Sequence, residues 1–496
     1  MKDYKKLQNG SDIRGVALQI DGGKPVNLTK EAAADIAYGF AVWLSEKLGK
    51  NFPELTIAVG GDSRLTTHEL GYTMAITLQN MGVNVLVSEL STTPAMFMAT
   101  VFDSVKADGS VMITASHLPV ERNGMKFFTR EGGLDKPDIA KIIQNAENRP
   151  PYSTLSIGSM EKTRLMDAYA KHLRTIICEG LGAKEEDKPL SGLHIVVDAG
   201  NGAGGFYVSS VLEPLGADCS GSQFLEPDGN FPNHIPNPEN EEAMNSICAA
   251  VKASKADLGI IFDTDVDRSS AVDENGCEIA RNRIVALAAV IAAEGQGNAT
   301  IVTDSITSTQ LADFLKAKGL VHFRFKRGYK NVINKMIEMN KDGGNCPLAI
   351  ETSGHAAMRE NYDLDDGAYL ATKIVVKAAQ LKKAGKGISA LLDGLEDPKE
   401  SIEIRLNVNT DDFGSYAQQV LDEVKNQVEA GNVEGASLEL PNYEGVRVNM
   451  ADGWFLIRKS LHDPVIPINI ESNAEGGCER IHAALNAIIS KFDKLS

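Results

Sequence analysis

The chain carries few basic residues for its length. Its 496 residues include 50 lysines and arginines against 67 aspartates and glutamates, which gives a formal net charge of −17. This balance argues against a protein that binds nucleic acid or an anionic membrane surface, although a local basic pocket for a small anion remains compatible with it. We therefore expect no nucleic acid and no membrane among the partners.

Long hydrophobic runs and paired cysteines are also missing. The longest strongly apolar run, "IVALAAVIAA" at 284–293, is about half as long as a membrane span and predicts a buried helix. The first residues, "MKDYKKLQNGSD", lack the apolar centre of a signal peptide. The six cysteines are scattered without a CxxC pair, as is typical of reduced, mostly buried thiols. These absences together predict a cytoplasmic protein.

What the chain does contain is a recurring α/β pattern. A β-branched apolar run, a loop of small and polar residues and a helix-like stretch follow one another in "LTIAVGGDSR" (55–64), "LHIVVDAGNGAGG" (193–205) and "ATIVTDSITSTQL" (299–311). Each segment predicts a buried strand that leads into a helix. After about residue 400, an alternating strand pattern and an amphipathic helix pattern predict a smaller α+β domain. Polar breaks between these regions place the predicted domains at 1–155, 156–276, 277–398 and 399–496.

The strongest chemical signal is "DTDVDR", which follows an apolar run. Asp263, Asp265 and Asp267 stand at every second position, and in an extended loop this spacing aims all three carboxylates to one side. Carboxylates that converge in this way favour a hard cation such as Mg²⁺. A calcium-binding EF-hand is a poor alternative, because Arg268 stands where its sharp turn requires glycine. A solvated acidic turn remains the other alternative.

A second signal is "TASHLPVERNGMK" at 114–126, where Ser116 stands beside His117. In an extended segment adjacent side chains point to opposite faces, so His117 could not easily act as the base for Ser116. If Ser116 is a nucleophile, its partners must therefore come from elsewhere in the chain.

The glycines of "DAGNGAGG" (198–205) match the dinucleotide-binding pattern GxGxxG. A dinucleotide site would need a further strand that ends in an acidic residue about 20 positions on. The sequence there, "FLEPDGNFPNHIPNPENEE", is rich in proline and asparagine and does not resemble the end of a strand. We favour a tight turn between a strand and a helix over a nicotinamide site.

The segment "ETSGH" places Glu351, Ser353 and His355 at alternate positions after another apolar run. A carboxylate, a hydroxyl and an imidazole on one face suit the recognition of sugar hydroxyls, although an ordinary polar loop is an alternative interpretation.

Two further segments carry basic residues that could meet an anion. "FKRGYKNV" (325–332) gathers Lys326, Arg327 and Lys330, which suits either a solvated face or an anion site. "GWFLIRKSLHDP" (453–464) places Arg458 and Ser460 at the end of a predicted strand, where a phosphate could be held.

Taken in order, "SDIRG", "GGDSR", "TASHLP", "DTDVDR", "ETSGH" and "RKSLHDP" resemble the motifs of the α-D-phosphohexomutase superfamily, most closely its bacterial phosphoglucomutase/phosphomannomutase group. The resemblance covers essentially the whole chain. It implies an α/β fold: three related α/β domains with mixed sheets and a smaller C-terminal α+β domain around a central cleft. It also implies an enzyme that interconverts hexose 1-phosphate and hexose 6-phosphate, of glucose and/or mannose, through an active-site phosphoserine. The cofactors would be Mg²⁺ and hexose 1,6-bisphosphate, which is the activator and intermediate.

The resemblance also implies a role for each matching residue. Ser116 would carry the phosphoryl group and would bind Mg²⁺ together with the three aspartates. The other predicted catalytic residues are Arg14, Lys126 and Arg268 around the phosphoserine, His117 to orient the loop, and Lys126 and His355 as acid/base candidates. The predicted sugar and phosphate contacts are Lys330, Glu351, Ser353, His355, Arg458 and Ser460. The partner would be a small sugar phosphate, and the enzyme would be a monomer or a homodimer.

Several positions depart from the family pattern. Leu118 replaces an asparagine, and Thr264 and Val266 replace glycines, although β-branched residues favour extended backbone and disfavour positive φ. In the last motif Leu461, His462, Asp463 and Pro467 replace the usual Gly, Thr, Glu and Arg. The altered last motif makes a catalytically silent sugar-phosphate-binding homologue an alternative function. Phosphoglucosamine mutase is another alternative, because "ETSGH" does not separate these groups, and a NAD-dependent oxidoreductase is the remaining rival.

Overall fold

The structure is a computed structural model that describes residues 2–151, 157–460 and 463–496. The departures Leu461 and His462, and the predicted boundary at 155–156, lie outside the described residues. The chain divides into two compact units: Met1–Ala280 with Ser353–Leu391, and Arg281–Thr352 with Leu392–Ser496. This division is coarser than the four predicted domains, whose boundaries stay a prediction.

The first part of the chain forms a mixed sheet in the order β1-β2-β6-β5-β3-β4-β8, and a short strand β7 pairs with β6. Strand β3 runs parallel to β4 and β5, and β4 runs parallel to β8, whereas β2, β6 and β5 pair antiparallel. The strands are β1 (Gln8–Asn9), β2 (Asp12–Val16), β3 (Thr56–Gly61), β4 (Asn84–Leu90), β5 (Gly109–Ile113), β6 (Arg122–Thr129), β7 (Gly132–Gly133) and β8 (Met160–Lys162). The mixed sheet agrees with the predicted fold class.

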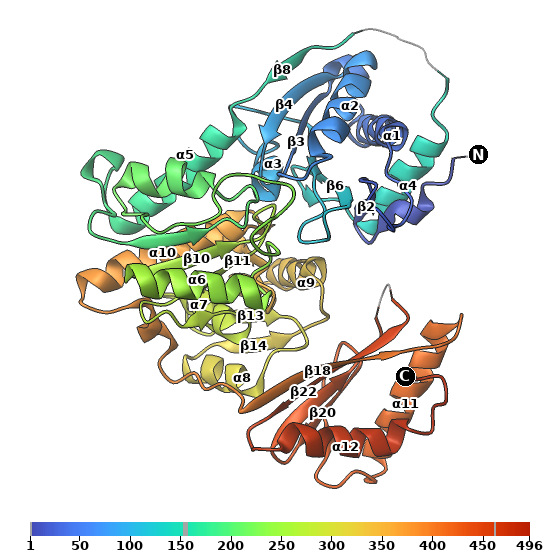
Figure 1. Ribbon diagram of the computed structural model, residues 1–496, viewed down its shortest axis with the longest axis vertical. Helices are drawn as coiled ribbons and strands as arrows, with labels where there is room; N and C mark the ends of the chain where they lie inside the picture. Colours follow the sequence, from blue (N-terminus) through green and yellow to red (C-terminus); the bar gives the residue numbers. More distant parts are fainter. Residues whose placement is uncertain (1, 152–156, 461–462) are drawn as a thin grey trace. The chain divides into compact units, whose positions relative to one another are not determined.

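Helices cover both faces of this sheet. One apolar core joins the sheet to α1 (Lys30–Leu48), α2 (Thr67–Asn80) and α4 (Lys136–Glu147), which Figure 1 shows on one side of β3 and β4. On the other face, a side chain at Gly60 would meet Met96 of α3 (Thr93–Met98). Because both faces are covered, β3 and β5 are buried almost throughout, as their continuous apolar sequences predict.

The second sheet has the order β12-β11-β10-β9, with β9 and β10 parallel and the other pairs antiparallel. Its strands are β9 (Ile195–Asp198), β10 (Leu258–Phe262), β11 (Ser269–Val272) and β12 (Glu278–Ile279). Helix α6 (Glu241–Ser254) packs against this sheet through Val196, Ile261 and Val272. Helix α10 (Gly367–Lys383) lies against β10 and β11, and α5 (Leu165–Leu181) lies against α10. The hairpin of β16 (Ala356–Met358) and β17 (Leu364–Asp365) precedes α10.

The second unit begins with three parallel strands in the order β14-β13-β15. Their bounds are β13 (Thr300–Thr303), β14 (Val321–Arg324) and β15 (Leu348–Ile350), and the accompanying helices are α7 (Asn282–Ala292), α8 (Thr309–Ala317) and α9 (Tyr329–Lys341). The apolar run at 284–293 lies within the buried helix α7 and its end, as predicted. In the described part of the chain, no helix combines the length and apolar character that crossing a membrane requires.

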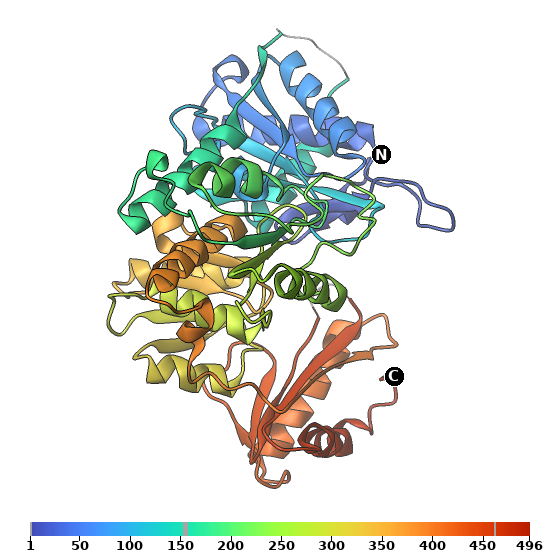
Figure 2. The ribbon, with the colours of Figure 1, turned by 60° about the vertical axis from the view of Figure 1, so that its left-hand side comes forward.

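The C-terminal region is an antiparallel sheet in the order β18-β22-β21-β20-β19, and two helices share one core with it. Its elements are β18 (Glu400–Asn407), α11 (Phe413–Glu429), β19 (Ser437–Leu438), β20 (Val446–Met450), β21 (Gly453–Ile457), β22 (Val465–Ser472) and α12 (Gly477–Ile489). Figures 1 and 2 show α11 and α12 beside this sheet. The predicted α+β domain is therefore confirmed.

Candidate active site

Ser116 follows the buried strand β5 and is itself 4% exposed. Its φ of +52° is a left-handed conformation that non-glycine residues seldom adopt, and the Thr114 hydroxyl accepts its N–H at 2.8 Å. This turn brings Ser116 Oγ within 3.2 Å of His117 Nδ1. The prediction that these two side chains point to opposite faces is therefore wrong, because the backbone is not extended at Ser116.

His117 is placed to accept hydrogen bonds rather than to carry charge. Its Nδ1 accepts a hydrogen bond from Arg268 Nη2. Burial, followed by the positive charge of Arg268, lowers the pKa of His117 to about 2. The imidazole is therefore neutral, and its Nδ1 faces both the serine hydroxyl and the guanidinium.

The three aspartates of residues 263–268, here called the metal loop, follow β10 and converge, as predicted. Each offers a carboxylate oxygen, and these oxygens lie within 4.8 Å of one another. Asp263 and Asp265 are 0% exposed, and Asp267 is 1% exposed. Asp265 Oδ1 and Asp267 Oδ1 have no hydrogen-bond partner among the described residues. Burying a carboxylate oxygen without a hydrogen-bond partner costs free energy of folding. Carboxylate oxygens are also the ligands that Mg²⁺ prefers, so this donor set fits the ion.

The path of this loop differs from the prediction. The loop is a turn, in which Val266 N–H donates to the Asp263 carbonyl at 3.3 Å. Val266 has a φ of +65°, although a β-branched side chain disfavours that region. The carboxylates meet because of this left-handed residue rather than because the segment is extended.

The serine loop, residues 114–122 between β5 and β6, contacts the metal loop directly. Ser116 Oγ donates to Asp263 Oδ2 at 3.1 Å, and Arg268 Nη2 donates to Ser116 Oγ at 3.3 Å. Arg268 is 1% exposed, and its Nε donates to Asp263 Oδ2 at 3.1 Å. Asp263 lies 147 positions from Ser116, so the partners of the serine hydroxyl include residues far along the chain, as predicted.

Lys126 and Arg14 approach this cluster from neighbouring strands. Lys126 of β6 forms ion pairs with Asp267 and, at 3.4 Å, with Asp265. Burial favours a raised pKa for Asp267, but the positive charge of Lys126, followed by that of His355, outweighs burial and holds the pKa below its usual range. Arg14 of β2 donates to the Ala115 carbonyl at 3.5 Å and pairs with Asp12 at 3.0 Å, so it borders the serine loop.

His355 joins the same cluster through a partner that the sequence analysis missed. Its Nδ1 lies 2.6 Å from Asp365 Oδ2 and 3.9 Å from Asp267 Oδ1. Burial disfavours the imidazolium, but the two carboxylates outweigh burial and raise the pKa of His355 to about 9. The acidic run "DLDDG" was visible in the sequence, yet nothing local assigned Asp365 to His355.

Thr93 was also missed. Its hydroxyl donates to Asp265 Oδ2, and its N–H donates to the Asp265 carbonyl at 2.9 Å. Thr93 is the first residue of α3, which lies between β4 and β5 in the chain, and no local motif identifies it.

The other predicted contact residues are described within their own units. Ser353 is buried in the first unit, at 7% exposure. In the second unit, Glu351 Oε1 accepts the Gly328 N–H at 2.6 Å, and Lys330 lies in the first turn of α9. Arg458 follows β21 and is 9% exposed, and its Nε has no hydrogen-bond partner among the described residues. The Ser460 hydroxyl accepts the Asp463 N–H at 3.1 Å.

The glycines of 198–205 support the turn interpretation rather than a dinucleotide site. A side chain at Gly202 would collide with Thr264 of the metal loop, and one at Gly205 would collide with the Leu225 carbonyl. No strand is present in the described residues between β9 and β10, so the further strand that a dinucleotide site needs about 20 positions after the glycines is missing. These glycines therefore allow close backbone packing beneath the metal loop.

Comparison with known protein families agrees with this geometry. Three family models match the chain: phosphoglucomutase/phosphomannomutase alpha/beta/alpha domain I over residues 5–152, domain II over 167–276 and domain III over 280–397. The chain belongs to the phosphoglucomutase/phosphomannomutase family. Within this family, the serine loop lies in the match to domain I and the metal loop lies in the match to domain II.

Individual relatives cover nearly the whole chain. A phosphoglucomutase of Neisseria gonorrhoeae is 30% identical over 96% of this chain and 95% of the relative. A phosphomannomutase of Escherichia coli is 31% identical over 90% of this chain and 93% of the relative. The crystal structure of a phosphoglucomutase/phosphomannomutase family protein from Burkholderia thailandensis matches with a TM-score of 0.79 and 27% identity, and covers 97% of this chain and 96% of that one. Family and fold are therefore established together.

Proposed function

We propose that this protein is a phosphohexomutase that transfers a phosphoryl group between O1 and O6 of a hexose, with glucose and/or mannose phosphate as substrate. The observation that carries the proposal is the contact of Ser116 Oγ with Asp263 and Arg268 beside the buried carboxylates. A hydroxyl so placed can carry a phosphoryl group, because phosphoryl transfer depends on positioning and charge neutralisation. The relatives named phosphoglucomutase and phosphomannomutase support the choice of substrate class.

In the proposed reaction, Ser116 begins as a phosphoserine. The O6 hydroxyl of hexose 1-phosphate attacks its phosphorus, the bond between phosphorus and Ser116 Oγ breaks, and hexose 1,6-bisphosphate forms. After the bisphosphate turns around, Ser116 Oγ attacks the phosphorus on O1, and hexose 6-phosphate leaves. The phosphoserine is thereby restored, so the bisphosphate serves as both intermediate and activator.

Different side chains would stabilise charge, transfer protons and hold the metal ion in this reaction. Arg268 donates to Oγ and stabilises the negative charge that develops there as the phosphoryl group leaves. His355, which Asp365 keeps protonated near neutral pH, is the proposed proton donor to a leaving sugar oxygen, and Lys126 is the second acid/base candidate. Mg²⁺, held by Asp263, Asp265, Asp267 and a phosphoserine oxygen, would supply electrostatic stabilisation of the transferring group.

The remaining predicted residues would hold the sugar phosphate. Glu351 and Ser353 would bind ring hydroxyls that both substrate orientations present, and Arg458, Ser460 and Lys330 would contact the phosphate that does not react. Such remote contacts supply binding energy that positions the reacting end. A cytoplasmic location and a monomeric or homodimeric state stay predictions.

The test is ³¹P NMR of the protein with Mg²⁺, a trace of hexose 1,6-bisphosphate and the 1-phosphate of glucose, mannose or glucosamine in separate tubes. A 6-phosphate signal from glucose or mannose supports the proposal, and one from glucosamine alone identifies the phosphoglucosamine alternative. The absence of a 6-phosphate signal from all tubes, with the protein folded, favours either an unusual sugar substrate or the catalytically silent sugar-phosphate binder.

The matched variant is Ser116→Ala. It should abolish turnover and leave the fold intact, because a small loop side chain contributes little packing. Turnover close to wild type would remove Ser116 from the mechanism.

A further inference from the structure

Arg64 is a buried arginine at the carboxyl end of β3 that takes no part in the chemistry described above. Its side chain is 1% exposed. Nη1 donates to the carbonyl oxygens of Pro119 at 2.9 Å and Arg122 at 3.0 Å. Nη2 donates to the carbonyl oxygens of Ser116 and Leu118. One guanidinium thus binds the backbone of the serine loop along residues 116–122.

This arrangement suits a guanidinium and no other side chain. Its planar fork presents donors in fixed directions, whereas the ammonium of a lysine is a compact charge that cannot span carbonyls spread along a loop. A buried carbonyl oxygen that loses its donor costs about 1–3 kcal/mol. The loop backbone is therefore most stable in the conformation that keeps its carbonyl oxygens bonded to the guanidinium.

The conformation that Arg64 supports is the one on which the chemistry depends. Left-handed backbone at a non-glycine residue costs about 1–2 kcal/mol and persists only where the surroundings impose it. Ser116 has this conformation, and the carbonyl of Ser116 itself is bound to Arg64. The same turn lets Oγ reach Asp263 and Arg268.

Arg64 is itself fixed from several sides. Its Nε lies 3.7 Å from Asp62 Oδ2, and its own N–H donates to Asp62 Oδ1 at 3.0 Å. Its guanidinium carbon lies 5.3 Å from the centre of the Phe231 ring. A side chain at Gly229 would collide with the backbone of residues 63–65, so this neighbouring segment also packs closely against the arginine.

We propose that Arg64 is the positioning residue of the serine loop: its guanidinium holds Ser116 in the left-handed conformation that directs Oγ to Asp263 and Arg268. The inference rests on the proposed function and deepens it, because it names the residue that sets the geometry of the phosphoryl carrier. Arg64 acts through the loop backbone and does not touch the reacting atoms.

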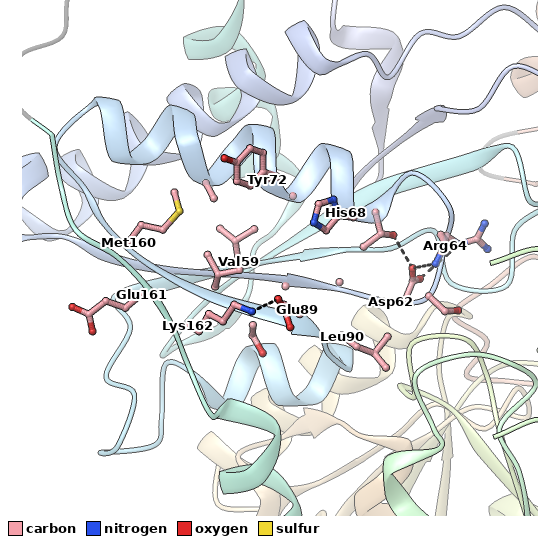
Figure 3. Close-up of a pocket in the computed structure, with 18 residues that line it drawn as sticks. Val59, Asp62, Arg64, His68, Tyr72, Glu89, Leu90, Met160, Glu161 and Lys162 are labelled. Atoms are coloured by element: carbon pink, nitrogen blue, oxygen red, sulfur yellow. Dashed lines mark hydrogen bonds and ion pairs between the residues drawn. The ribbon is translucent and has the colours of Figure 1, made fainter. Parts of the chain in front are cut away.

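A cavity beside Arg64 offers a way to test this role. It has a volume of about 530 Å³, and its lining includes Asp62, Ser63, Arg64, His68, Tyr72 and Leu90. Figure 3 shows Asp62 and Arg64 at one end and His68 and Tyr72 on the helix that forms one wall. Tyr72 is 58% exposed and Leu90 is 40% exposed, so the cavity reaches the surface. Because Arg64 lines this cavity, a small cation in solution can reach the cavity beside residue 64.

The experiment compares Arg64→Ala and Arg64→Lys with wild type for mutase kinetics, melting temperature, ³¹P NMR of phosphorylated Ser116 and amide hydrogen exchange. Both variants should lower kcat by about 100-fold with little change in KM, because misplacing a reacting group by about 1 Å costs that much. Exchange should accelerate at residues 116–122 and stay unchanged elsewhere. Millimolar guanidinium should restore at least a tenth of the lost rate to Arg64→Ala, whereas sodium chloride of equal ionic strength should restore none.

The matched control is Arg174→Ala. The Arg174 side chain is 18% exposed and donates to a backbone carbonyl, that of Ser210, at 2.6 Å, but Arg174 lies on α5 and Ser210 lies in the π-helix Tyr207–Leu212, away from the serine loop in the sequence. Its variant should keep the wild-type kcat and should not respond to guanidinium.

Each outcome decides the inference. An Arg64→Lys variant with wild-type kcat, or a folded Arg64→Ala variant that is inactive and does not respond to guanidinium, would overturn it. If Arg64→Ala does not fold, Arg64→Lys decides alone. Wild-type protein without mutase turnover would instead refute the proposed function, so the two failures are distinguishable.

Discussion

Val266 gives a quantitative test of the metal-loop geometry. It is fully buried, and its backbone has a φ of +65° where the family pattern has glycine. At an ordinary buried site, alanine is more stable than glycine by about 1.5 kcal/mol: about 0.8 kcal/mol from the buried methyl group and about 0.7 kcal/mol from glycine entropy. A left-handed conformation costs alanine about 1–2 kcal/mol, which cancels that advantage.

We therefore expect Val266→Ala and Val266→Gly to have equal stability within about 0.5 kcal/mol. The control pair is Val196→Ala and Val196→Gly, because Val196 is equally buried but lies in the regular strand β9. There the alanine variant should be more stable by about 1.5 kcal/mol.

The assay is differential scanning calorimetry of the intact protein in EDTA at a single scan rate. Val196 and Val266 both lie in the first unit, Met1–Ala280 with Ser353–Leu391. With an unfolding entropy of about 2.1 cal/mol/K per residue, a change of 1 kcal/mol shifts the melting temperature of a unit of roughly 300 residues by about 1.5 °C. The Val196 pair should therefore separate by about 2 °C, and the Val266 pair by less than about 1 °C. An equal gap for both pairs would refute the left-handed backbone at Val266 and the loop path built on it.

Three further variants test other parts of the structure. Asp265→Asn removes one charged ligand from the triad and should raise the Mg²⁺ concentration for half-maximal activity by about 10-fold or more; an unchanged Mg²⁺ titration would contradict the site. Burial raises the pKa of Glu471 to about 7 despite the positive charge of Arg447 and the Trp454 N–H that donates to it, so the ionisation of Glu471 should lower the free energy of unfolding by about 3 kcal/mol as the pH rises from 4.5 to 7. The unfolded state loses its proton first over this range, so the difference in free energy of unfolding between wild type and Glu471→Gln, measured with urea, should change by about 3 kcal/mol between pH 4.5 and 7; a difference that does not depend on pH would refute the raised pKa of Glu471. His234→Ala leaves the buried carboxylate of Asp198 without the imidazole that lies 3.0 Å away and should destabilise the fold by about 3 kcal/mol. The double variant His234→Ala/Asp198→Ala should be more stable in thermal unfolding than His234→Ala alone. Equal stability of the two variants would argue against the interaction of His234 with Asp198.

The sequence alone predicted the elements and the positions of the chemistry along them. Continuous apolar runs predict β5 and β10, because these strands are buried on both faces. Polar residues that interrupt such runs predict where the strands end. The order of the motifs was enough to identify the family and to single out Ser116, Arg268 and the aspartates. These features depend on residues close together in the chain, which is why the pattern reveals them.

Only the tertiary structure decided which of those residues meet and in what backbone conformation. Local preference disfavours positive φ at Ser116 and Val266, so the sequence predicted extended segments, and packing imposed the left-handed turns. Arg64 and Asp365 gain their roles from contacts with the serine loop and with His355, and nothing in their own segments specified either contact. A long-range contact depends on how whole strands and helices pack, and that information is distributed over the entire fold.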